Sequence, residues 1–236
     1  MNEWLEREEL LIGRENIEKL NKSTVAVFGC GGVGSYALEA LVRAGVGNIV
    51  LIDKDIVDIT NINRQLIADT TTVGQDKVEV AKQRALRINP NINIEIHKCF
   101  YDENHTELIK PKYDYIVDAI DSVKSKISLI QEAHNKNVKI ISAMGMGNKL
   151  NPTMVEVADI SKTEMCPLAK VVRKRLREIG INHTKVVYSK EPVTRTDNSL
   201  ENKGTTGNHS RPQSFWTGYG LWLHPRRAWF YRRPAS

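Results

Sequence analysis

A glycine-rich loop between an apolar strand and a helix is the feature that most constrains this fold. Residues 25–28 are all apolar, and the loop after them reads Gly29-Cys30-Gly31-Gly32-Val33-Gly34. A helix is expected over 33–44, with Gly45 as its stop. In this setting a G-x-G-x-x-G loop turns tightly and brings the free N–H groups of a helix N-terminus close to a phosphate. The loop therefore predicts a nucleotide site that uses Gly29, Gly31, Gly32 and Gly34.

Strands and helices alternate along the rest of the chain. Further strands are expected at 49–52, 92–97, 115–118, 138–142, 154–159 and 185–189. The helices between them are expected at 74–89, 124–135 and 167–179. This order favours an α/β fold with a Rossmann-like, doubly wound, mostly parallel sheet. The last two strands are expected to extend it as antiparallel strands.

The chain is expected to have three parts. Residues 1–22 form a helical N-terminal segment, and residues 23–190 form the nucleotide-binding domain. Residues 191–236 are expected to be irregular, because they exchange a Lys- and Ile-rich composition for Arg, Trp and Pro. Two interpretations of this end stay open: a basic aromatic arm that binds RNA, and a stretch that is not native sequence.

Charge and cysteine content limit the function classes. The net charge is +6, but five arginines and no acidic residue lie in 211–236, and the remaining residues net only +1. The overall charge therefore does not by itself indicate a nucleic-acid partner. No run approaches the roughly 18 apolar residues of a membrane span. Three well-separated cysteines form neither a disulfide framework nor a paired zinc site, so we expect a cytoplasmic protein with no membrane span.

Polar residues after the second strand distinguish between two kinds of nucleotide. Asp53 ends that strand, where a carboxylate accepts hydrogen bonds from ribose hydroxyls. A nicotinamide dinucleotide needs little more from the protein, because the hydride chemistry belongs to the cofactor. This chain adds further polar residues at the same edge of the predicted sheet. They are Asp55, Asn61, Asn63, Arg64, Gln65, Lys77, Asp121 and Ser122.

These residue types suit ATP with Mg²⁺ better than a nicotinamide ring. Arg64 and Lys77 would neutralise phosphate oxygens, and Asp121 would hold the magnesium ion. The alternatives are ordinary surface salt bridges for the two cations and a helix N-cap for Asp121 and Ser122.

Four motifs make a resemblance specific: GCGGVGS, LIDKDIVDITNINRQ, GQDKVEV and DAIDSV. In this order and spacing they resemble the E1-like family of ubiquitin-activating-type adenylating enzymes, over residues 5–190. The resemblance implies an ATP–Mg²⁺ site formed by the glycines, Asp53, Asn61, Asn63, Arg64, Lys77 and Asp121. It also implies a homodimer in which Arg7 reaches the ATP of the partner. In the implied reaction a carboxylate attacks the ATP α-phosphorus, pyrophosphate leaves, and a nucleophile then attacks the acyl-adenylate.

Residues 142–181 bear on whose carboxylate is activated. This run resembles the tRNA-modifying branch of the family, which implies a threonylcarbamoyl adenosine beside the anticodon as substrate. The implied outcome is a cyclising dehydration with release of AMP. Family members that activate ubiquitin-like sulfur carriers usually carry two Cys-x-x-Cys pairs, which this chain lacks. A carrier or sulfur-transfer protein as partner, a non-catalytic nucleotide-binding module and an NAD dehydrogenase stay as alternatives.

The helix expected after Cys166 has a basic face. Lys170, Arg173, Lys174 and Arg177 lie opposite an apolar stripe of Leu168, Val172, Leu176 and Ile179. The four cations predict a phosphate-binding surface for tRNA, with a merely solvated helix face as the alternative. Cys166 itself is either a thioester-forming residue or a small buried hydrophobe, and the second interpretation is favoured.

Overall fold

A single seven-stranded sheet organises the molecule, in the order β3-β2-β1-β4-β5-β7-β6. The computed structural model describes residues 3–147 and 149–192. The strands are β1 (Thr24–Phe28), β2 (Asn48–Ile52), β3 (Asn93–His97), β4 (Tyr115–Asp118), β5 (Ile140–Ala143), β6 (Val155–Asp159) and β7 (Lys185–Ser189). The prediction for residues 193–236 lies outside the described residues.

Helices cover both faces of this sheet. One face carries α3 (Gly34–Arg43) and α4 (Lys77–Ile88), and the other carries α5 (Val123–Asn135) and α6 (Pro167–Glu178), whereas α1 (Glu6–Ile12) and α2 (Arg14–Lys22) precede β1. Short 3-10 helices are η1 (Glu3–Leu5), η2 (Ile59–Asn61), η3 (Thr106–Leu108), η4 (Pro152–Met154) and η5 (Ile160–Lys162). Alternate residues of β1 divide between two cores: Val25 and Val27 pack with residues of α3 and α4, and Ala26 and Phe28 pack with residues of α5 and α6. The doubly wound α/β prediction is confirmed.

The end of the sheet differs from the sequence-based expectation in one respect. Only β6 is antiparallel to its neighbour, because β7 pairs with β5 in the parallel sense and with β6 in the antiparallel sense. In this antiparallel pair the last residue of β6, Asp159, lies opposite the first residue of β7, Lys185, and Ile160 N donates to Thr184 O at 2.9 Å. Alternation of apolar residues identifies a strand but does not tell which neighbour it pairs with or in which direction.

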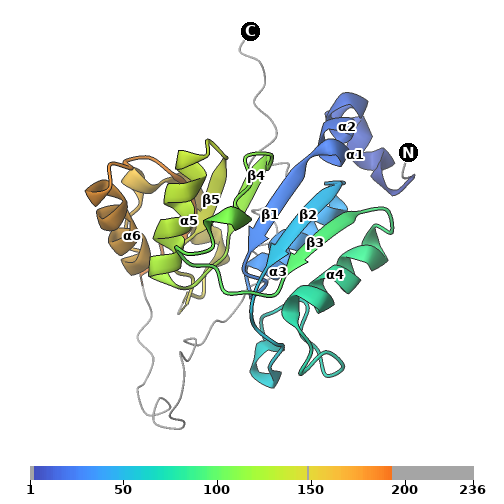
Figure 1. Cartoon of the computed structure of the whole chain (residues 1–236), viewed down its shortest axis with the longest axis horizontal. Helices are drawn as coiled ribbons and strands as arrows, with labels where there is room; N and C mark the ends of the chain where they lie inside the picture. Colours follow the sequence, from blue (N-terminus) through green and yellow to red (C-terminus); the bar gives the residue numbers. More distant parts are fainter. Residues whose placement is uncertain (1–2, 148, 193–236) are drawn as a thin grey trace.

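The N-terminal helices lie at the amino ends of the parallel strands. Gly47 N, just before β2, donates to Leu20 O at the end of α2 at 3.1 Å. A Cβ at Gly45, which has φ +86°, would lie 2.9 Å from Leu5 Cδ1, so η1 packs closely against this turn. Figure 1 shows α1 and α2 beside the start of β1, at the end of the sheet opposite the segment that follows β2. None of the helices in the described part of the chain is long and apolar enough to span a membrane.

Candidate functional site

The glycine loop between β1 and α3 is shaped by two glycines that the fold requires. Gly29 has φ +93°, and a Cβ there would lie 2.6 Å from Ala119 O. A Cβ at Gly34 would lie 1.7 Å from Gly29 O, which no relaxation of a side chain could relieve. The loop therefore closes on itself and on the residue that follows β4 only because both positions lack side chains.

Gly31 has a different environment. A Cβ at this position would meet only Gln65 Nε2, at 3.9 Å, so internal packing does not require a glycine there. The N-terminus of α3 beside it has no side-chain cap. An uncapped helix N-terminus next to a residue without a side chain is the arrangement that accepts phosphate oxygens. The predicted phosphate-binding role of Gly31 fits this geometry.

Asp53 joins the end of β2 to the glycine loop. Its Oδ2 accepts a hydrogen bond from Cys30 N at 2.6 Å, and its Oδ1 accepts one from Asp55 N at 2.8 Å. Burial raises the pKa of this carboxyl, and the two backbone donors together with Lys77 act in the opposite direction. Because each carboxylate oxygen has a second lone pair, these bonds leave Asp53 able to accept from ribose hydroxyls.

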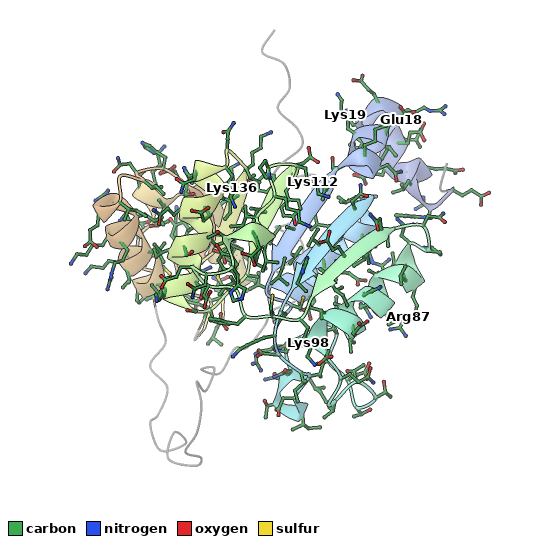
Figure 2. The ribbon with its side chains drawn as sticks, viewed as in Figure 1. Glu18, Lys19, Arg87, Lys98, Lys112 and Lys136 are labelled. Carbon is green, nitrogen blue, oxygen red and sulfur yellow. The ribbon has the colours of Figure 1, made fainter. Side chains whose placement is uncertain are left out.

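An ion pair holds Lys77 at the start of α4. Its Nζ lies 3.1 Å from Asp55 Oδ2, and its backbone N donates to Asp55 O at 3.0 Å. The Lys77 side chain is only 7% exposed, whereas that of Asp55 is 51% exposed. The salt bridge foreseen as the alternative for Lys77 is present, but it holds the ammonium group at the same edge as the glycine loop. At this edge Lys98, which follows β3, also pairs with Asp76 at 2.6 Å (Figure 2).

The segment of η2 uses several of its predicted site residues for its own turn. Asn61 Oδ1 accepts from Asp58 N at 3.2 Å and completes a capping box. Arg64 Nη1 donates to Thr60 O at 2.8 Å and to Asn63 Oδ1 at 3.1 Å. These contacts place Arg64 on a preformed turn beside the site, and phosphate binding by Asn61, Asn63 and Arg64 stays a prediction.

Gln65 is buried against the glycine loop with an unsatisfied amide oxygen. The residue is 6% exposed, and its Oε1 has no hydrogen-bond partner within the described residues. The segment is tied to α3 by a bond from Leu66 N to Ser35 Oγ at 3.1 Å. A buried polar atom without a partner indicates a missing group, and the open space at Gly31 lies next to this amide. The two features together fit a bound nucleotide.

Asp121 and Ser122 follow β4, and the sequence predicted either a magnesium ligand or a helix N-cap at these positions. Ser122 Oγ accepts from Ser125 N at 3.4 Å and caps α5. The exposed Asp121 carboxylate makes no hydrogen bond or ion pair with the part of the chain that the structure describes. Within that part no group of three or more His, Cys, Asp or Glu could hold a metal ion. Mg²⁺ commonly takes one or two carboxylates plus substrate phosphates, and Asp121 fits that mode of binding.

Arg7 does not join the site of its own chain. It is exposed on α1, which lies at the amino ends of the strands, whereas the glycine loop lies at their carboxyl ends (Figure 1). Only another molecule could receive this guanidinium at its nucleotide site, so the predicted role of Arg7 requires a second chain.

The basic face of α6 is narrower than the sequence indicated. Lys170, Lys174 and Arg177 are exposed, whereas Arg173 Nη1 donates to Thr163 O at 2.7 Å. Arg173 thereby anchors α6 to the preceding loop, which makes it unsuited to phosphate binding. The helix ends at Glu178, so Ile179 lies outside the apolar stripe and is exposed.

Cys166 is buried, as favoured from the sequence. Its Sγ accepts from Ala169 N at 3.5 Å and caps α6. A thiol in this position has no access to a substrate in the described structure.

Sequence reasoning missed one polar cluster close to the site. Lys126 of α5, Asp118 of β4 and Ser142 of β5 are fully buried together. Lys126 precedes the buried Leu129 and Ile130 by three and four residues, so it occupies the apolar face of its helix. That position was the available signal, because a lysine on an apolar face requires a buried partner.

Comparisons with known proteins agree with this geometry. The ThiF family model matches residues 5–206. A tRNA threonylcarbamoyladenosine dehydratase of Bacillus subtilis is 50% identical over 187 residues, which cover 78% of this chain and 74% of that protein. Its namesake in Haemophilus influenzae is 41% identical over 70% of this chain and 63% of its own length.

Solved structures extend the similarity to the whole described fold. Escherichia coli tRNA N6-threonylcarbamoyladenosine dehydratase, TcdA, superposes with a TM-score of 0.84 in complex with AMP and 0.82 in complex with ATP. Both are 29% identical to this chain and cover 96% of it, and the match covers 94% and 93% of the two solved chains.

The different environments of two glycines give a paired prediction. Gly31→Ala should fold with nearly unchanged thermal stability but lose most of its stabilisation by Mg–ATP, because the methyl group would occupy the phosphate position. Gly34→Ala should lower the free energy of unfolding by about 1–3 kcal/mol or more, because its methyl group would overlap Gly29 O. Thermal unfolding with and without Mg–ATP checks both. Equal behaviour of the two variants would contradict the different roles assigned to them.

Proposed function

Because the chain belongs to the ThiF family, we propose that it is an ATP-dependent tRNA-modifying enzyme that adenylates a carboxylate and promotes a cyclising dehydration. The proposed substrate is threonylcarbamoyladenosine beside the anticodon, and the by-products are AMP and pyrophosphate. The names of the relatives and the AMP and ATP complexes of TcdA support this assignment. The observation that carries it is the open space at Gly31 in the glycine loop, at the edge of the sheet where Asp53 contacts this loop, Lys77 is held by Asp55, and Asp121 follows β4.

The chain contributes positioning and charge neutralisation at this edge. The glycine loop and the N-terminus of α3 hold phosphate oxygens, and Asp53 accepts from the ribose. Lys77 and Arg64 offset the negative charge of the phosphates, and Asp121 binds the accompanying Mg²⁺. ATP supplies an activated phosphorus for the substrate carboxylate. The nucleophile that follows is the carbamoyl group of the substrate itself, so neither a catalytic cysteine nor a general base is needed.

The ion pair of Lys77 and Asp55 prepares the site for an anion. With Lys77 buried and Asp55 half exposed, the carboxylate can swing into solvent while the ammonium stays in place. A phosphate oxygen that replaces Asp55 keeps the buried charge compensated, which avoids the cost of an unpaired buried cation.

A homodimer completes the site in this proposal. Arg7, Leu10 and Leu11 are spaced to share one face of α1, and the two leucines are 89% and 62% exposed. Adjacent exposed leucines on a short helix favour contact with another protein surface. In the proposed dimer the second copy covers these leucines, and Arg7 of the first copy then reaches the nucleotide bound by the second copy.

The tRNA contact is proposed for a stripe on α6 made of Lys170, Lys174 and Arg177, called the basic stripe. Their spacing of four and then three residues puts them on one line along the helix, and all three are exposed. The stripe supplies phosphate contacts, whose contribution to affinity falls with salt.

The remaining hypotheses gain less support. A carrier-protein adenylyltransferase would share the nucleotide site, but Cys166 is buried and the sequence has no Cys-x-x-Cys pair. A sulfur-transfer partner and the cytoplasmic location stay predictions.

The experiment that tests the proposal is mass analysis of tRNA nucleosides after incubation with Mg–ATP. The wild-type protein should convert threonylcarbamoyladenosine to a product lighter by one water. Arg64→Ala should reduce the rate by roughly 10²–10³-fold, as expected when one donor to the transition-state charge is lost. Arg87→Ala is the matched control, since Arg87 is exposed near the end of α4 (Figure 2) and should leave the rate unchanged. A wild-type protein that consumes no modified adenosine would overturn the proposal.

Reversing the charge of the basic stripe should weaken tRNA binding. In the triple variant Lys170→Glu, Lys174→Glu and Arg177→Glu, the salt dependence of binding should fall by up to about three ion-release units. Stabilisation by Mg–ATP should not change, because α6 is not part of the nucleotide site.

The charge-matched control is Lys22→Glu, Arg87→Glu and Lys112→Glu. These three residues are also exposed but do not share a helix face. Filter binding of tRNA over a series of salt concentrations measures both variants. An equal loss of tRNA affinity in the two variants would show a general charge effect and contradict the assignment of tRNA binding to the basic stripe.

The shared site predicts complementation between two inactive variants. Arg7→Ala and Arg64→Ala should each be inactive as homodimers. After equal mixing and subunit exchange, half of the dimers carry one intact site, so activity should recover to roughly a quarter of the wild-type value. Mass analysis of tRNA nucleosides measures it. Full activity of Arg7→Ala alone, or no recovery after verified exchange, would contradict a shared site.

A further inference from the structure

Three fully buried polar side chains lie near the edge of the sheet that carries the glycine loop, Asp53, Lys77 and Asp121, called the nucleotide edge. Lys126 Nζ is 2.8 Å from Asp118 Oδ2 and 3.2 Å from Ser142 Oγ. The Ser142 hydroxyl also donates to Asp118 Oδ2, and the two residues are paired across β4 and β5. All three residues are 0% exposed. They form one cluster between α5 and the centre of the sheet.

Stability alone does not account for this cluster. Taking two charges out of water costs several kcal/mol per ion, and apolar residues of similar volume usually serve a core equally well. The surroundings on α5 are apolar, with Leu129, Ile130 and Ala133 fully buried. An oriented ion pair in such a setting fixes geometry more than it stabilises the fold.

The cluster fixes the turn that connects β4 to Asp121. Asp118 Oδ1 accepts from Ile120 N at 3.0 Å, one residue before Asp121. On the opposite side Ala119 N donates to Phe28 O at 2.8 Å, and Ala119 O lies against Gly29. The turn that presents Asp121 is therefore held by Asp118 and by the glycine loop.

Lys126 also fixes the other end of this turn. Its backbone N donates to Ser122 O at 2.9 Å in the first turn of α5. Its side chain returns to Asp118, so the four residues from Asp118 to Asp121 are anchored to the helix that follows them. A shift of α5 relative to β4 would change the direction of the Asp121 carboxylate.

We propose that Asp118, Lys126 and Ser142 are positioning residues that aim the Asp121 carboxylate at the Mg²⁺ and phosphates of the bound nucleotide. The proposal rests on the proposed function in that Asp121 is the residue assigned to Mg²⁺. None of the three can touch a ligand, because all are buried. They act through the turn from residue 118 to residue 121.

Calorimetric titration of ATP over a series of Mg²⁺ concentrations tests this proposal without any turnover. Lys126→Met should raise the Mg²⁺ concentration for half-maximal tight binding by roughly 10–100-fold, the usual effect of removing a group that orients a metal ligand. ATP binding without Mg²⁺ should stay the same. Ser142→Ala should change the Mg²⁺ dependence in the same direction by a smaller factor.

A double-mutant cycle with Asp121→Asn separates positioning from a general loss of stability. If Lys126 acts through Asp121, Lys126→Met should have no further effect on Mg²⁺ dependence in the Asp121→Asn background. Arg84→Met is the matched control. It removes the ion pair of Arg84 with Glu39 (2.7 Å) between α4 and α3, and it should lower thermal stability without changing the Mg²⁺ dependence.

An unchanged Mg²⁺ dependence in Lys126→Met, or an equal shift with and without Asp121, would overturn the proposal. If Lys126→Met does not fold, Ser142→Ala carries the same test in the same cycle. A wild-type protein that binds Mg–ATP but does not modify tRNA would overturn the proposed function and leave this inference intact.

Discussion

The close approach of the glycine loop to Ala119 is the constraint on which the nucleotide edge depends. Gly29 turns with a positive φ directly against Ala119 O, and Gly34 packs against Gly29 O. These contacts bring the ends of β1 and β4 together, and the bond from Cys30 N to Asp53 adds the end of β2. Three neighbouring strands thus bring the glycine loop, Asp53 and Asp121 to the same edge of the sheet, and these are the groups proposed to bind phosphate, ribose and Mg²⁺.

The chemistry proposed for this edge follows from its charges. In the proposal Lys77 and Arg64 would provide positive charge for phosphates, and Asp121 would provide a carboxylate for Mg²⁺, which commonly binds one or two carboxylates together with substrate phosphates. Among the described residues, two buried side-chain atoms lack a hydrogen-bond partner: the amide oxygen of Gln65 beside the glycine loop, and the hydroxyl of Tyr113, which precedes β4 at the other end of the sheet. An enzyme that only aligns ATP with a carboxylate and neutralises charge needs this set and no nucleophile of its own.

Much of this architecture could be predicted from the sequence, because it depends on periodicity and on glycine. Apolar runs located the strands, and the glycines from Gly29 to Gly34 located the tight loop between β1 and α3. The motifs after Asp53 indicated the kind of nucleotide. Each of these features depends on residues that are close together in the sequence, so it can be recognised without a structure.

The sequence did not reveal which side chains and strands pair with one another within the fold. Arg173 is equivalent to its basic neighbours in the sequence, yet it binds Thr163 O instead of solvent. The position of Lys126 on the apolar face of α5 signals a buried partner, but the folded structure is needed to identify this partner as Asp118, eight positions earlier in the chain. The direction of β7 depends on β5, which lies more than 40 residues away. Pairings of this kind are decided by the folded geometry, which spacing alone does not contain.

In the proposed reaction one oxygen of the substrate carboxylate attacks the ATP α-phosphorus and displaces pyrophosphate, and the same oxygen leaves in AMP when the ring closes. The most direct measurement uses tRNA in which the threonyl carboxylate carries heavy oxygen, with mass analysis of the nucleotide products. One labelled oxygen should appear in AMP, because the bond formed at the α-phosphorus persists when the carbamoyl group closes the ring and AMP departs. Unlabelled AMP, or label in inorganic phosphate together with ADP, would contradict carboxylate adenylation.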